Sequence, residues 1–62
     1  MTAMFVRDQI SDKFLPANNM AVAQFAILSK MRLTSKDLLT VKAKGIRVIY
    51  PNGVDIETSE LA

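Results

Sequence analysis

The chain has 62 residues and a formal net charge of +2; half of its residues are apolar, and it contains neither cysteine nor histidine. This composition excludes disulfides, and it removes the commonest catalytic base, the thiol nucleophile and the usual transition-metal ligands. The length predicts one domain over residues 1–62. A domain of this size buries only about 60% of its unfolded surface. Because small domains are often stabilised by association, the high apolar content leads us to expect a homodimer.

The remaining polar residues show no catalytic pattern. The six carboxylates are scattered along the chain, and Gly45 and Gly53 are too far apart to form a phosphate-binding loop. We therefore expect a protein that is not an enzyme, that needs no cofactor or metal, and that acts by binding.

No segment has the features of a membrane span or of a secretory signal. The longest apolar segment, residues 20–31, has twelve residues, whereas a membrane-spanning helix needs about 20. Residues 1–7 lack a basic stretch ahead of an apolar run, which a secretory signal has. The sequence thus predicts a cytoplasmic protein without membrane contacts.

The first element in chain order is a helix of roughly two turns over residues 8–15. Asp8 is a suitable N-cap, and Ile10 and Phe14 lie four residues apart on one helix face. Pro16 ends this helix, because the residue before a proline avoids the α region. Residues 4–6 fit either a short edge strand or the lead-in to this helix.

A second helix is predicted over residues 20–31, after the turn that contains Asn18 and Asn19. Nine of its twelve residues are apolar, so its apolar surface extends around most of the helix. Such a helix is expected to be buried from several sides. In so small a domain this again favours a partner subunit.

The third predicted helix spans residues 34–44. Thr34 and Asp37 have the spacing of a capping box, and Gly45 is suited to the left-handed residue that closes a helix.

After Gly45 the apolar period changes to two, which predicts a β-hairpin over residues 46–57. Pro51-Asn52-Gly53 fits a three-residue turn with Gly53 in the left-handed region. This turn pairs Ile49 with Asp55 and Arg47 with Glu57. The predicted fold is therefore α+β, with three short helices followed by a C-terminal hairpin.

Charge is unevenly distributed along the chain. Residues 30–47 contain six basic residues and one carboxylate, whereas residues 48–62 contain three carboxylates and no basic residue. Lys36, Thr40 and Lys44 form one row on the third helix. This distribution indicates an anionic partner for the middle segment. A solvated helix face balanced by an acidic hairpin is the alternative.

Two helices followed by a hairpin resemble the small winged helix-turn-helix proteins of phages, such as Cro-like repressors and excisionases. The resemblance covers residues 20–57 and implies a DNA-binding transcriptional regulator or a DNA-architectural protein. It assigns residues 34–44 as the recognition helix and residues 46–57 as the wing or dimer ribbon. The residues expected to contact DNA are Arg32, Thr34, Ser35, Lys36, Thr40, Lys44 and Arg47.

A protein–protein interaction module is the second possibility that the sequence leaves open. Examples are a phage inhibitor of a host protein, an antitoxin or a virion joining protein. In this interpretation the acidic segment 55–62 docks on a basic partner.

Overall fold

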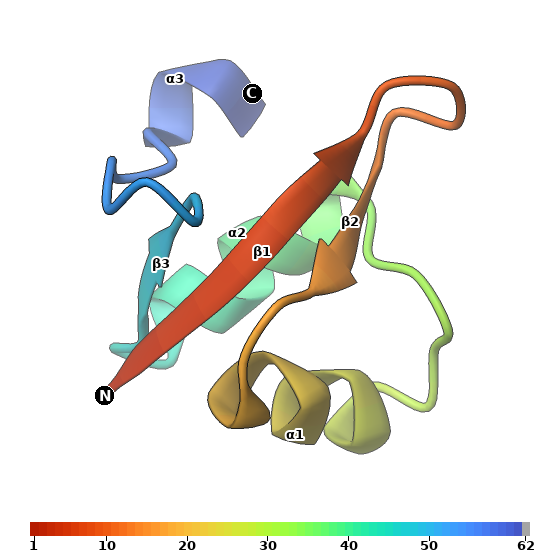
Figure 1. Cartoon of the computed structure of the whole chain (residues 1–62). Coiled ribbons are helices and arrows are strands. Elements are labelled where there is room, and N and C mark those ends of the chain that lie inside the picture. Colours follow the sequence, from red (N-terminus) through yellow and green to blue (C-terminus); the bar gives the residue numbers. More distant parts are fainter. Residues whose placement is uncertain (62) are drawn as a thin grey trace.

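The computed structural model describes residues 1–61 and contains a three-stranded sheet with strand order β2-β1-β3. β1 pairs antiparallel with β2 and parallel with β3 (Figure 1). In chain order the elements are β1 (Thr2–Asp8), β2 (Lys13–Pro16), α1 (Asn19–Ile27), α2 (Ser35–Ala43), β3 (Arg47–Ile49) and α3 (Thr58–Leu61). The fold is α+β, but the prediction of three helices followed by a C-terminal hairpin is wrong, because a strand pair precedes the helices.

The predicted helix over residues 8–15 is instead the turn and second strand of the β1–β2 hairpin. The Asp8 carboxylate accepts from the Ile10 N–H over 3.0 Å and from the Ser11 hydroxyl over 2.8 Å. It therefore organises a turn, a role for which Asp competes well against helix capping. Phe14 is fully buried whereas Ile10 is 98% exposed, so the two residues do not share a face.

The core lies between the sheet and the helices. Ala3 and Phe5 of β1 and Val48 of β3 point into it, and the Phe5 ring stacks on Phe25 of α1 with ring centroids 6.2 Å apart. In Figure 1, α2 crosses behind β1 and α1 lies near the end of β2. The main packing partners of α1 are β1 and β2, and those of α2 are β3 and α3. The helices thus pack on strands and on α3, whereas a helix-turn-helix unit packs its two helices on each other.

The predicted helix over residues 20–31 is shorter than expected. α1 ends at Ile27, and Ser29 has a positive φ of 53° that turns the chain away from the helix axis. α2 agrees with its prediction, since Thr34 is its N-cap and Gly45 follows it with φ 84°. Among residues 1–61, no helix combines the length and apolar character that crossing a membrane requires.

The C-terminal segment keeps the predicted turn but not the predicted hairpin. The Gly53 N–H donates to the Tyr50 carbonyl, Gly53 has φ 87°, and Ile49 bridges Asp55. Beyond that bridge, residues 56–61 form no second strand. Arg47 pairs with Asp55 over 2.7 Å and not with Glu57. β3 pairs instead with β1, which is the longer strand, and the following chain folds into α3 with Leu61 buried.

Candidate functional site

A backbone bridge holds the loop between α1 and α2 against the outer edge of β2. The Phe14 N–H donates to the Leu33 carbonyl over 2.7 Å, and the Leu33 N–H donates to the Phe14 carbonyl over 3.0 Å. Both side chains are fully buried, so the bridge is anchored in the core. An open hollow of about 530 Å³ flanks it, which we call the basic hollow; it is lined by Lys13, Lys30, Met31, Arg32 and Thr34.

The basic hollow has uncompensated positive charge. Lys30 Nζ lies 2.7 Å from Asp37 Oδ2, whereas Lys13 and Arg32 make no ion pair with any residue of the described range 1–61. Hydrogen bonds from the Ser11 hydroxyl and the Ile10 N–H hold the pKa of Asp8 below its ordinary value, and the positive charge of Arg32 adds to this shift. Arg32 therefore interacts electrostatically with the Asp8 carboxylate but forms no ion pair with it.

Thr34, in the wall of the basic hollow, has its polar groups occupied by Asp37. The Thr34 hydroxyl accepts from the Asp37 N–H and donates to Asp37 Oδ2, which also accepts from the Thr34 N–H. Partial burial acts to raise the pKa of Asp37, but the hydrogen bonds from Lys30 and Thr34 outweigh it and the pKa lies below its ordinary value. The start of α2 is thus capped from within, and Lys13 and Arg32 of the basic hollow are exposed to solvent.

The predicted row on α2 is exposed to solvent. The helix that carries it begins directly after Thr34, which lines the basic hollow. Lys36, Thr40 and Lys44 are all exposed, and Ser35, the first residue of α2, is partly buried. The Thr40 hydroxyl donates to the Lys36 carbonyl over 3.3 Å. Lys36 and Lys44 have no ion-pair partner within residues 1–61. Their ammonium groups are therefore available to a ligand.

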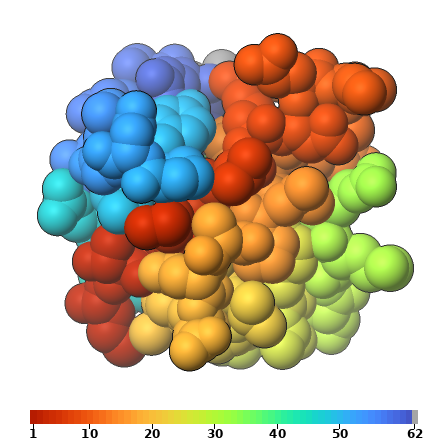
Figure 2. Space-filling model, in the orientation of Figure 1, coloured from red at the N-terminus to blue at the C-terminus, as the bar shows by residue number. Residues whose placement is uncertain are grey.

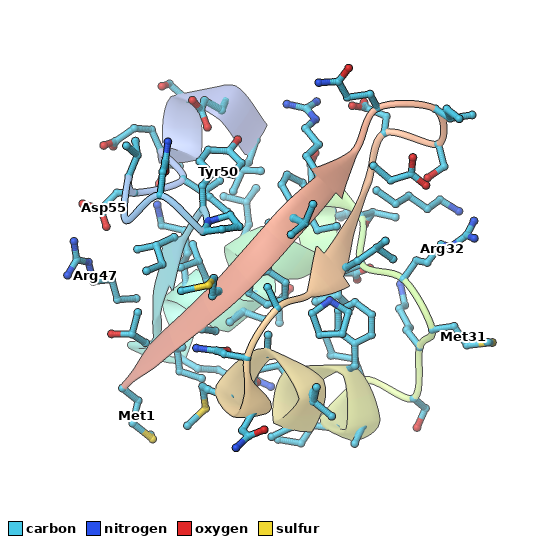
Figure 3. All side chains as sticks on the ribbon, viewed as in Figure 1. Met1, Met31, Arg32, Arg47, Tyr50 and Asp55 are labelled. Atoms are coloured by element: carbon cyan, nitrogen blue, oxygen red, sulfur yellow. The ribbon has the colours of Figure 1, made fainter. Side chains whose placement is uncertain are left out.

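Arg47 lies apart from the other predicted contact residues. Its guanidinium is paired with Asp55 on β3's outer side, and this hydrogen bond raises the pKa of Arg47. Figure 3 shows Arg32 and Arg47 on opposite sides of the molecule. The structure thus gathers Arg32 and Thr34 in the basic hollow and Ser35, Lys36, Thr40 and Lys44 on the adjoining helix, but it separates Arg47 from them.

Three residues of the basic hollow were not among the predicted contacts: Lys13, Lys30 and Met31. In the space-filling view the green side chains of the α1–α2 loop protrude at the right, next to the orange β2 (Figure 2). Lys13 reaches this place only because β2 forms, and the sequence interpretation put it on a helix. The run Lys13-Phe14-Leu15 does not alternate polar and apolar residues, so no periodicity in the sequence indicated a strand there.

Comparisons of the chain with protein-family models, with curated proteins and with solved structures found no match. They give no support to the resemblance to winged helix-turn-helix proteins, and the described part of the chain contains no hairpin wing of the kind on which that resemblance depended. The function is therefore argued from the surface itself.

Proposed function

We propose that the protein is a non-enzymatic DNA-binding protein of the cytoplasm whose basic hollow and exposed α2 row contact the phosphate backbone. The observation that carries this proposal is the distribution of ion pairs. Arg7, Lys30 and Arg47 pair with carboxylates, and Lys42 donates to the Ile56 carbonyl. Within the described residues, the cations without such a partner are Lys13, Arg32, Lys36 and Lys44.

Two of these four cations line the basic hollow, and the other two belong to the α2 row that begins close to it along the chain. Lys13 and Arg32 line the basic hollow together with Thr34, and Lys36 lies two residues beyond Thr34 on α2. Lys44 ends the same helix row. Phosphate contacts by lysine and arginine supply most of the affinity of proteins for DNA, and they do not require the binding protein to read a sequence.

Met31 supports the choice of a nucleic acid over a small anion. It lines the basic hollow between Lys30 and Arg32 and is 91% exposed. Proteins that bind the minor groove of DNA use arginine and lysine contacts and insert apolar side chains, methionine among them, between base steps. A small anion would leave this side chain unused.

The alternative of a protein–protein module is favoured by Ile10, which stands 98% exposed at the tip of the β1–β2 hairpin. The acidic segment expected to dock on a basic partner is instead folded: residues Thr58–Leu61 form α3, and Glu60 accepts from the Tyr50 hydroxyl over 3.1 Å. The ion-pair distribution therefore makes DNA binding the primary proposal.

The test is a fluorescence titration of a random-sequence duplex at several salt concentrations. We expect log K to fall with log salt with a slope of about −3 to −4, since each neutralised phosphate contributes about −0.9. Arg32→Ala should reduce the size of this slope by about one. Arg47→Ala is the matched control: it removes the same charge from a position that is also exposed but is ion-paired and distant from the hollow.

Two results would contradict the proposal. One is the absence of binding at about 50 mM salt, where electrostatic attraction to DNA is strong; this result would favour the protein–protein alternative. The other is an equal loss of slope in Arg32→Ala and Arg47→Ala, because net charge rather than the basic hollow would then govern binding. If the protein bound single-stranded RNA more tightly than the duplex, the ligand would be RNA and the proposal of DNA binding would be wrong.

A further inference from the structure

α1 exposes a continuous apolar surface without any charge. Residues 14–29 contain no charged side chain, and α1 buries Ala21, Gln24 and Phe25 against the sheet. Its exposed side begins with the uncharged Asn19 and continues with Val22, Ala23, Ala26 and Ile27, and we call these four apolar residues the neutral face. Val22 is 53% exposed and Ile27 is 63% exposed. A helix that covers a small domain normally has polar or charged residues on its outer side.

We propose that the neutral face binds a second copy of this chain, so that two α1 helices meet about a twofold axis. The first argument is electrostatic. In a twofold contact each surface meets itself, so any charge on it would face its own like charge, which costs affinity. The neutral face has no such charge, and it equally offers no counter-charge to a basic or acidic partner.

The second argument is the alternation of large and small side chains. Val22 and Ala26 form one row four residues apart, and Ala23 and Ile27 form the next; such rows are the ridges through which helices pack. An antiparallel arrangement sets Val22 against Ala26 of the partner subunit. It likewise sets Ala23 against Ile27 of the partner subunit, so that each large side chain meets a small one. The neutral face is thus complementary to itself in shape as well as in charge.

The third argument is the area available. The chain has 3913 Å² of accessible surface and Cα extents of 22, 22 and 21 Å. If the whole side that carries α1 takes part, about a sixth of this surface on each copy, two copies bury about 1,300 Å² in total, and stable specific interfaces bury about 1,200–2,000 Å². The four residues of the neutral face form the centre of such a contact, and the residues around α1 supply its rim.

The test is sedimentation equilibrium of the whole chain. At about 100 µM, well above a micromolar dissociation constant, we expect twice the monomer mass of 6.9 kDa. Ala26→Lys should raise the dimer dissociation constant at least about tenfold, because it sets a charge in the contact. Ala43→Lys, a change of the same exposed residue type on α2, should leave it unchanged. Circular dichroism establishes that each variant is folded, and Ala23→Lys replaces Ala26→Lys if the latter is not.

A mixing experiment tests the antiparallel pairing. Val22→Glu alone should also dissociate the dimer, whereas an equal mixture of Val22→Glu and Ala26→Lys should associate, since the glutamate then faces the lysine of the other chain. A monomeric wild type overturns the proposal, as does an Ala26→Lys variant that associates as tightly as Ala43→Lys. A mixture that stays monomeric overturns the antiparallel arrangement. None of these outcomes depends on DNA binding, because the neutral face shares no residue with the basic hollow.

Discussion

Thr34 and Asp37 bond reciprocally at the start of α2: the Thr34 N–H donates to the Asp37 carboxylate over 2.9 Å, and the Asp37 N–H donates to the Thr34 hydroxyl over 3.2 Å. The same carboxylate holds Lys30 of the preceding loop. One pair of residues therefore begins the helix and fixes a wall of the basic hollow.

Removing this cap should destabilise the protein measurably. We expect Thr34→Ala to lower the free energy of unfolding by about 1 kcal/mol, because the Asp37 N–H loses its acceptor. Thr40→Ala is the control, since the Thr40 hydroxyl bonds only the carbonyl one turn earlier on the exposed side of α2. Urea denaturation monitored by circular dichroism measures both. Equal effects of the two substitutions would contradict a capping role for Thr34.

Asp37 should also make stability depend on pH. Its pKa is lowered in the folded protein by hydrogen bonds from Lys30 and Thr34, despite the opposing effect of burial. A carboxyl with a lowered folded pKa contributes stability that is complete above its unfolded pKa of about 3.9 and is lost as the pH falls through the folded pKa. The advantage of the wild type over Asp37→Asn should therefore be constant near neutral pH and shrink below about pH 4. Urea titrations across this range check it, and a difference that does not change with pH would contradict it.

Substitution of Gly53 should destabilise the protein because of its backbone conformation, and not because a side chain would clash. Its φ of 87° is rarely adopted by other residues, yet a Cβ at this position would meet no atom within 4 Å. Gly53→Val should therefore cost about 1–2 kcal/mol through conformational strain, and Gly53→Asn should cost less, because asparagine tolerates the left-handed region. Thermal unfolding of the two variants measures the difference. Equal midpoints for glycine and valine would show that the turn is not held in this conformation.

Local signals in the sequence predicted α2 and the turn at residues 51–53, whereas the N-cap signal at Asp8 predicted a helix where the β1–β2 turn forms. The Thr34–Asp37 spacing and Gly45 define α2 within a few residues, and the glycine of the 51–53 turn was placed correctly. The β1–β2 hairpin was missed because its turn residue in the left-handed region is Asp12 and not a glycine. The parallel pairing of Ala3 with Val48 joins strands that are far apart in the sequence, and no short-range pattern specifies such a contact.

For the candidate site too, the sequence predicted the residues that are close along the chain but not those that the fold brings together or separates. Arg32 and Lys36 lie in the basic segment that composition identifies, and the structure leaves both without an ion pair among the described residues. Lys13 comes from a different part of the chain, and only the Phe14–Leu33 bridge brings it to the basic hollow. Arg47 belongs to the same charged segment as Arg32, but β3 places it on the other side of the molecule.

Gln24 provides the last prediction, because it is a polar residue in an otherwise apolar core. It is 4% exposed, its Oε1 has no hydrogen-bond partner within the described chain, and its Nε2 reaches only Met20 Sδ at 3.8 Å. A buried amide whose oxygen has no partner loses the hydration of that oxygen without compensation, whereas an apolar side chain of similar shape avoids that cost.

Gln24→Met should therefore raise the free energy of unfolding by about 1 kcal/mol, at the low end of the cost of a buried unpaired polar group. Gln9→Met is the matched control, since Gln9 is exposed in the β1–β2 turn and the same change there removes no burial cost. Urea denaturation of both variants under identical conditions gives the comparison. A destabilised Gln24→Met protein would mean that the amide satisfies its oxygen in solution, for instance through a bound water, and that the core is built around that polar contact.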